Sequence, residues 1–231
     1  SDDYRNEMNG MGYIVEINPY NKAVSAKKRT ALGRFAHESA AFGKVVVGQP
    51  VSVYMGDDSR GEYIYKFVST AVWSAADANP ADSMAVGDKY LDSGKLYVAK
   101  FNADGSGTWV ELAMTNAAIA AYATYKFDDA ADIAINTRLA ADAVGATKMD
   151  RPEWNAVNPA NGEIYFTLTN NSNRSINPSS SQYLPDAANP RAYTDMKGTS
   201  AQKGNPNGHL VRMKEGASVT AFAWDVYLFG A

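Results

Sequence analysis

The stretch at residues 147–172, TKMDRPEWNAVNPANGEIYFTLTNNS, contains one complete unit of β architecture. A short apolar segment at 154–157 is followed by the turn sequence Asn-Pro-Ala-Asn-Gly and then by a β-rich run at 163–169. Two such runs on either side of a Gly-containing turn predict a β-hairpin. The stretch therefore predicts that the chain is built from antiparallel strands.

A cation and an anion stand at the start of the first of these strands, where Arg151 and Glu153 flank Pro152. Proline fixes its own φ and disfavours helical conformations for the residue before it, so we expect Arg151 to be extended. Side chains at i and i+2 of an extended chain point the same way. A guanidinium that can hold an oxyanion would then lie beside a carboxylate that can hold a metal. An ordinary surface ion pair is the alternative interpretation of this spacing.

The composition limits the chemistry that the chain can perform. The 231 residues carry a formal net charge of −3 at pH 7, which gives no reason to expect a nucleic-acid partner. The chain contains no cysteine and only two histidines, so a metal would be held mainly by oxygen ligands, which favour hard ions such as calcium. No apolar run approaches the roughly 20 residues of a membrane-spanning helix.

Strand signals recur along most of the chain. β-rich runs bounded by Asn, Asp, Gly and Pro predict strands at residues 12–17, 44–47, 51–55, 62–69, 95–101, 108–112, 208–214 and 221–229. Residues 115–144 are rich in alanine and repeat apolar side chains at helical intervals. We expect one or two helices there, with Asp128, Asp129 and Asp132 near the start of the second. Residues 74–93 and 173–206 are expected to be irregular.

Hairpin-like units return at intervals of about 40–55 residues, which is the range of propeller blades. We therefore expect a single domain at residues 1–231 with an all-β, β-propeller-like fold. It would be a partial propeller of several blades, with helical or irregular insertions at about 74–93 and 115–145. A β-sandwich with a helical insertion is the alternative, because it would produce a similar pattern.

Two further acidic residues are candidates for chemistry. Glu38 follows His37 in the segment GRFAHESA, but no second histidine stands at the spacing of a helical zinc motif. Asp57 lies at the start of a turn, where aspartate is favoured by its own bonds to the backbone. A turn-closing role and a metal-binding role are both open for Asp57. From the residues alone, the sequence predicts an oxygen-rich all-β protein that could hold a metal.

Several segments resemble the PhoX-type alkaline phosphatases, a family of exported bacterial enzymes. These segments are KKRTALGRFAHESA (27–40), VYMGDDSRGEYIYKFVS (53–69), GKLYVAKFNADGSG (94–107), TKMDRPEW (147–154), EIYFTLTNNS (163–172) and the tail at 208–230. They lie in order and span most of the chain. The resemblance implies a β-propeller enzyme that cleaves phosphomonoesters at alkaline pH. Its central channel would hold iron and calcium ions. It also implies a periplasmic or secreted location.

The resemblance implies roles for individual residues. Glu38, of the family's H-E-x-A motif, and Glu153, of R-P-E, would bind metal, and Arg151 would hold the phosphate. Asp57 is a further candidate metal ligand. Multivalent cations neutralise phosphate oxygens, and a bidentate guanidinium adds a directional contact. The expected partners are the phosphomonoester substrate and the remaining segments of the same propeller.

The sequence departs from the family pattern in three ways. It has no cysteine, whereas the family's iron site includes a thiolate, and Ser39 stands where a glycine is usual. We also expect a later segment with further ligands to be missing. These departures predict a middle fragment or a divergent member with an incomplete calcium and iron site and little phosphatase activity of its own. The alternatives are a non-catalytic secreted module that binds calcium or a partner, and a phosphodiesterase or phosphotriesterase variant of the same site.

Overall fold

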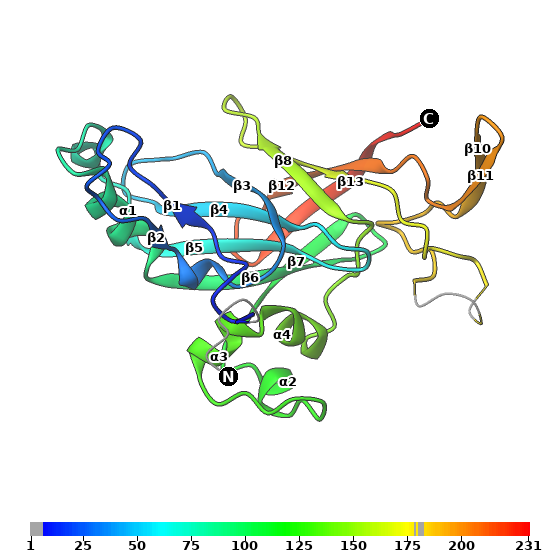
Figure 1. The fold of residues 1–231 in the computed structure, drawn as a ribbon, viewed down its shortest axis with the longest axis horizontal. Coiled ribbons are helices and arrows are strands. Elements are labelled where there is room, and N and C mark those ends of the chain that lie inside the picture. The colour runs from blue at the N-terminus through cyan, green and yellow to red at the C-terminus, as the bar shows by residue number, and fades with distance from the viewer. Residues whose placement is uncertain (1–6, 178, 180–182) are drawn as a thin grey trace.

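The computed structural model describes residues 7–177, 179 and 183–231, and its main feature is one antiparallel sheet of nine strands (Figure 1). The strand order across this sheet is β3-β4-β5-β6-β7-β13-β12-β9-β8. The first and last strands of this order, β3 and β8, pack side by side, so the sheet is nearly closed. The strands of the structure are β1 (Val15–Glu16), β2 (Lys27–Lys28), β3 (His37–Phe42), β4 (Pro50–Asp57), β5 (Ile64–Val72), β6 (Gly94–Phe101), β7 (Ser106–Glu111), β8 (Pro152–Val157), β9 (Ile164–Leu168), β10 (Tyr193–Lys197), β11 (Ser200–Gly204), β12 (His209–Glu215) and β13 (Ala221–Phe229).

Consecutive strands pair as hairpins, as the alternating sequences predict. β4 pairs with β5, β6 with β7, β8 with β9 and β12 with β13, all antiparallel. β7 also pairs with β13, and this pairing joins the hairpins from the two halves of the chain. The expected all-β, propeller-like class with a helical insertion is confirmed. The hairpins are joined edge to edge into one continuous sheet.

The central strands are buried on both faces. Successive residues of a strand point to opposite faces. On β5, Ile64 and Val68 belong to the core inside the nearly closed sheet, together with Trp109 from β7 and apolar residues of β9, β12 and β13. Tyr65 and Phe67 of β5 face outward into a second core. A strand buried on both faces reads as a continuous apolar run rather than as an alternation.

Helices cover the outer face of the sheet at β4, β5 and β6. α1 (Ser83–Leu91) packs against β5, and α2 (Ala117–Ala120), α3 (Ala130–Ile135) and α4 (Thr137–Ala143) lie below the sheet in Figure 1. α3 begins after Asp129, whose carboxylate accepts a hydrogen bond from the Asp132 amide, as expected for an acidic helix start. Two short 3-10 helices, η2 (Thr30–Leu32) and η3 (Ala75–Ala78), precede β3 and α1. Within the described residues, no helix has both the length and the apolar character needed to cross a membrane.

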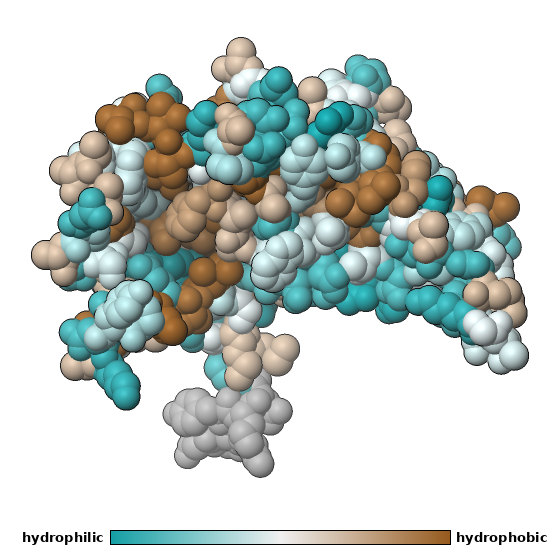
Figure 2. Space-filling view, turned by 90° about the horizontal axis from the view of Figure 1, so that it is seen from above, coloured by the Kyte–Doolittle hydropathy of each residue, from teal (hydrophilic) through white to brown (hydrophobic). Residues whose placement is uncertain are grey.

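The strand expected at residues 44–47 is absent, and this prediction was wrong. The strand lies earlier, at β3, and Val45, Val46 and Val47 form part of an exposed loop. Figure 2 shows apolar side chains gathered on the end of the molecule that carries β1, α1 and this loop. Valine-rich sequence predicts a strand only if a neighbouring strand is available for pairing. Here β4 pairs instead with the small residues of β3.

Two segments expected to be irregular contain regular structure. Residues 74–93 include η3 and α1, and Asp82 caps α1 by accepting hydrogen bonds from the Met84 and Ala85 amides. Residues 173–206 include the β10–β11 hairpin, which projects at the right of Figure 1. The polar composition of this hairpin concealed it, because neither of its faces enters a core.

An ion pair between a buried lysine and a partly exposed glutamate connects β5 to the end of β12. Lys66 is 1% exposed, and its ammonium donates hydrogen bonds to the Glu215 carboxylate and the Val219 carbonyl. Tyr54 Oη and Trp109 Nε1 donate to the same carboxylate. Burial lowers the pKa of Lys66, and the charge of Glu215 opposes that effect. Donors from β4, β5 and β7 therefore meet at one acceptor from β12.

We expect Lys66→Met to destabilise the protein by about 2 to 4 kcal/mol, because the variant leaves the Glu215 carboxylate without its cation. Lys95→Met is the matched control. Lys95 forms an exposed pair with Glu111, and such pairs contribute about 1 kcal/mol or less. Urea unfolding measures both changes. Equal effects of the two substitutions would contradict the role assigned to the Lys66–Glu215 pair.

Candidate functional site

The two glutamates predicted as metal ligands lie on irregular positions of the two terminal strands of the sheet. The pairing of β3 with β4 shifts register between His37 and Ser39, so Glu38 is an extra residue in a β-bulge. The pairing of β8 with β9 shifts register between Pro152 and Asn155, and Glu153 lies in that irregular stretch. Bulges redirect side chains and are frequent beside active sites. The structure thus brings Glu38 and Glu153 to facing bulges of adjacent strands.

Arg151 is not extended, and this prediction was wrong. Its φ is 52°, and it is the one non-glycine residue with a positive φ among the described residues. This left-handed conformation is uncommon for a residue other than glycine and costs roughly 1 to 3 kcal/mol. Proline restricts the residue before it but does not exclude this region when the surrounding contacts impose it. Strained backbone of this kind is frequent at functional sites.

The backbone on both sides of Arg151 is held firmly. Asp150 is fully buried, and its carboxylate accepts hydrogen bonds from Asn171 Nδ2, Arg174 Nε and Asn205 Nδ2. The Arg151 carbonyl accepts from the Thr169 amide on the other side. None of these partners was predicted as part of the site. In the sequence these partners belong to a polar segment without a recognisable pattern. Their hydrogen bonds to Asp150 join residues up to 55 positions apart, so local sequence does not predict them.

The Arg151 guanidinium is oriented by a second aspartate, Asp58. Arg151 Nε and Nη2 donate to the two oxygens of Asp58, both at 3.0 Å, and Nη1 donates to Asn170 Oδ1. Glu153 Oε1 lies 3.9 Å from Nη2, so the expected pairing of Arg151 with Glu153 is present but looser than the pairing with Asp58. A guanidinium has five N–H donors. Two of them form no hydrogen bond within the part of the chain that the structure describes.

Negative charge accumulates around Glu153. Partial burial raises the pKa of the Glu153 carboxyl, the charges of Asp58 and Glu38 raise it further, and Arg151 opposes them. Neither Glu38 nor Glu153 accepts a hydrogen bond through its carboxylate within the described residues. Carboxylates that repel one another and have no donor to satisfy them make a place where a cation is favoured.

Asp57 has partners that serve the turn. Its buried carboxylate accepts hydrogen bonds from Arg138 Nε at 2.7 Å, from Arg138 Nη2 at 2.5 Å and from the Ala36 amide at 3.2 Å. Burial raises the pKa of Asp57, and the bonds to Arg138 oppose that shift. The side chain is thus directed toward α4, and Asp58 is the aspartate that contacts Arg151. A metal-binding role for Asp57 stays a prediction.

The donor set of the site fits calcium in part. Glu38 and Glu153 supply hard oxygen ligands of the kind that calcium takes. No group of three or more His, Cys, Asp or Glu side chains is arranged as a metal site among the described residues. Calcium takes roughly six to eight oxygen ligands, so these carboxylates are a partial set. The chain offers no thiolate for iron.

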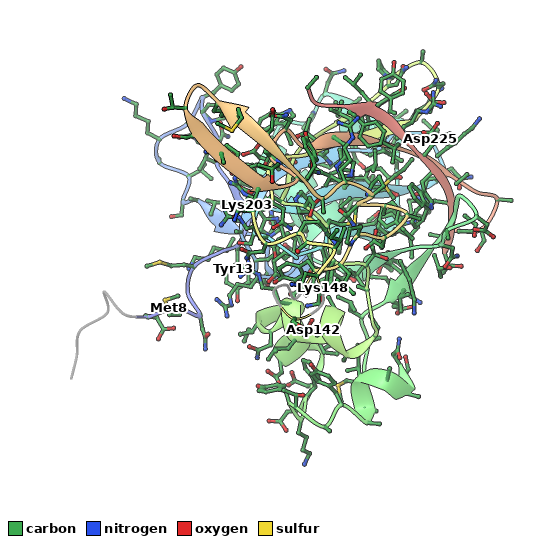
Figure 3. The ribbon with its side chains drawn as sticks, turned by 90° about the vertical axis from the view of Figure 1, so that its right-hand side faces the viewer. Met8, Tyr13, Asp142, Lys148, Lys203 and Asp225 are labelled. Atoms are coloured by element: carbon green, nitrogen blue, oxygen red, sulfur yellow. The ribbon has the colours of Figure 1, made fainter. Side chains whose placement is uncertain are left out.

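A second acidic cluster lies on the side of the β4–β5 turn that faces α4. Arg138 approaches Glu62 Oε2 at 3.5 Å, and burial raises the pKa of Glu62 from its ordinary value of 4.5 to about 7. Nearby, Asp142 accepts hydrogen bonds from Tyr63 Oη and Lys148 Nζ. Figure 3 shows Asp142, on α4, close to Lys148 where the helices meet the sheet. This cluster attaches the helical insertion to the turn that carries Asp57 and Asp58.

Comparison with known proteins gives one family and one solved structure. The sequence model of the family described as alkaline phosphatase PhoX matches residues 2–231. The structure of Pseudomonas fluorescens PhoX in complex with vanadate, a transition state analogue, is similar to this chain, with 39% sequence identity and a TM-score of 0.75. The similarity covers 96% of this chain and 36% of the Pseudomonas fluorescens chain, so the chain spans about a third of that protein's length. No curated protein matches the chain.

We expect Glu62→Gln to stabilise the protein at alkaline pH. The folded pKa of about 7 lies above the ordinary 4.5, so Glu62 contributes fully to stability below pH 4.5, and this contribution is lost as the pH rises through 7. The variant should match the wild type near pH 4 and exceed it at pH 8.5 by about 1 to 3 kcal/mol. Urea unfolding at the two pH values tests this. A less stable variant at pH 8.5 would mean that attraction to Arg138 outweighs burial.

Proposed function

The chain belongs to the PhoX alkaline phosphatase family, and on that premise we propose that it supplies part of the phosphate- and metal-binding site of a metal-dependent phosphomonoesterase. The observation that carries this proposal is the meeting of Glu38, Glu153 and Arg151 at two facing bulges, although more than 100 residues separate the first from the others. The same proposal includes activity of the phosphomonoesterase at alkaline pH and a location outside the cytoplasm.

Glu38 and Glu153 are proposed as metal ligands. Both carboxylates are accessible to solvent at least in part, and neither has a hydrogen-bond donor within the described residues. Calcium or iron, when bound there, would neutralise phosphate oxygens and supply Lewis-acid chemistry. The chain itself would hold the ions through oxygen atoms, and further donors must come from water, from the phosphate or from other protein segments. These residues alone favour calcium over iron, because the chain has no thiolate.

Arg151 is proposed to bind the phosphoryl group. Its contact with Asp58 fixes the plane of the guanidinium, and two N–H donors stay available for oxyanion contacts. The left-handed backbone at Arg151 is consistent with a residue held in place for binding. The vanadate bound to Pseudomonas fluorescens PhoX supports a phosphoryl group as the ligand class.

A non-catalytic module that binds calcium is the second candidate function. It is favoured by the small number of carboxylates gathered among the described residues. Metal analysis of the purified chain separates the two candidates. Iron together with calcium supports a phosphatase site, whereas calcium alone supports the second function.

We expect Glu38→Gln and Glu153→Gln each to weaken calcium binding at least tenfold, which corresponds to about 1.4 kcal/mol, because each removes one charged ligand. Glu163→Gln is the matched control. Glu163 lies at the opposite end of the β8–β9 hairpin, where it accepts a hydrogen bond from Tyr165. Isothermal titration calorimetry with calcium measures all three variants. If the two site variants bind calcium like the control, these carboxylates are not ligands.

We expect Arg151→Lys to weaken vanadate binding at least tenfold in the presence of calcium, since lysine cannot reproduce the planar fork of the guanidinium. Arg212→Lys serves as the control, because Arg212 forms an exposed pair with Asp225 on the outer face of β12 and β13. Vanadate titration by calorimetry gives both affinities. Unchanged affinity in Arg151→Lys, or equal losses in the two variants, would remove Arg151 from the proposed site.

A further inference from the structure

The two strands that carry the candidate metal ligands are joined by side chains at their contact. β3 and β8 stand at opposite ends of the strand order, and no ladder of backbone hydrogen bonds connects them among the described strands. We call the contact of β8 with β3 and β4 the seam. The distance between Glu38 and Glu153 depends on how this seam is held.

Three contacts close the seam. Ser39 Oγ donates a hydrogen bond to the Glu153 carbonyl at 3.0 Å. Asn155 Nδ2 donates to the Tyr54 carbonyl at 2.8 Å. Pro152 approaches Gly56 so closely that a Cβ added at Gly56 would lie 2.5 Å from the Pro152 carbonyl oxygen.

We propose that Ser39 is a positioning residue that fixes the separation of the Glu38 and Glu153 carboxylates across the seam, an inference that rests on the proposed function. Ser39 follows Glu38 in the chain, and its hydroxyl binds the carbonyl of Glu153 itself. One hydrogen bond therefore connects the backbone of the two bulges. The hydroxyl acts through the backbone and contacts neither metal nor phosphate.

The burial of Ser39 and its place in a bulge make this single hydrogen bond important for the local backbone geometry. Ser39 is 8% exposed, so its hydroxyl has little access to water as an alternative partner. A bulge lacks part of the regular ladder, so its backbone is held less firmly than the rest of the strand. Glycine or alanine at this position would lack the hydroxyl and leave the Glu153 carbonyl without this donor.

Thr167 provides a matched comparison on the opposite edge of β8. Its hydroxyl accepts a hydrogen bond from the Trp154 amide at 3.0 Å and donates to the Trp154 carbonyl at 3.1 Å. Thr167 thus holds the residue next to Glu153, but it does so from β9, which already pairs with β8. Removing this hydroxyl should affect stability without changing the distance across the seam.

The test compares Ser39→Ala with Thr167→Val in calcium titrations by calorimetry and in urea unfolding. We expect Ser39→Ala to weaken calcium binding by a factor of about ten, as loss of a residue that orients a ligand does. Thr167→Val should keep the wild-type affinity within about twofold. The two variants should shift the urea midpoint by similar amounts, which shows that the loss of affinity does not follow from lower stability.

The possible outcomes separate this inference from the function on which it rests. Wild-type affinity in Ser39→Ala, with Glu153→Gln still impaired, overturns the positioning role and leaves the proposed function intact. Equal losses of affinity in Ser39→Ala and Thr167→Val also overturn it. A wild-type chain that binds no calcium overturns both the proposed function and the positioning role.

Discussion

The close approach of Pro152 to Gly56 is the constraint on which the site depends. Any residue with a Cβ at position 56 would collide with the Pro152 carbonyl. Strand β8 can therefore lie against β4 only because this position is glycine. That approach closes the sheet and places β8 beside β3, although about 100 residues separate them in the chain. Glu38 and Glu153 then meet through tertiary closure of the sheet, and neither local hairpin could bring them together.

The same closure explains why strain is tolerated at Arg151. A left-handed arginine before a proline is unfavourable by itself, and it persists only where the residues around it are fixed. On one side, Pro152 is packed against Gly56. On the other side, Asp150 is buried under Asn171, Arg174 and Asn205, and a buried carboxylate with this many donors is costly to displace. The polar segment after β9 thus fixes the backbone at Asp150, next to Arg151.

The sequence predicted the parts of this arrangement that depend on local pattern. Alternating runs and turn residues identified the hairpins, and the alanine-rich stretch identified the helices at α3 and α4. The family motifs pointed to Glu38, Glu153 and Arg151 as candidates, and the structure places their segments side by side. Bulges, the conformation of Arg151 and its pairing with Asp58 could not be predicted, because they arise from contacts between distant strands. Residues 44–47 were wrongly predicted to form a strand. Their β-propensity is high, but no neighbouring strand pairs with them.

The helical insertion contacts the turn beside the candidate site, although the two are far apart in the sequence. Asp57 and Asp58 are neighbours at the end of β4, and adjacent residues of an extended chain point in opposite directions. Asp57 is held by Arg138 of α4, while Asp58 holds Arg151. One dipeptide therefore contacts both the α4 helix, through Asp57, and the Arg151 guanidinium, through Asp58. Asp57 is fully buried, whereas the Asp58 side chain is 16% exposed, so Asp57 lies on the core side of the turn and Asp58 lies nearer to solvent. The helical insertion thus holds the same turn whose next residue, Asp58, orients Arg151.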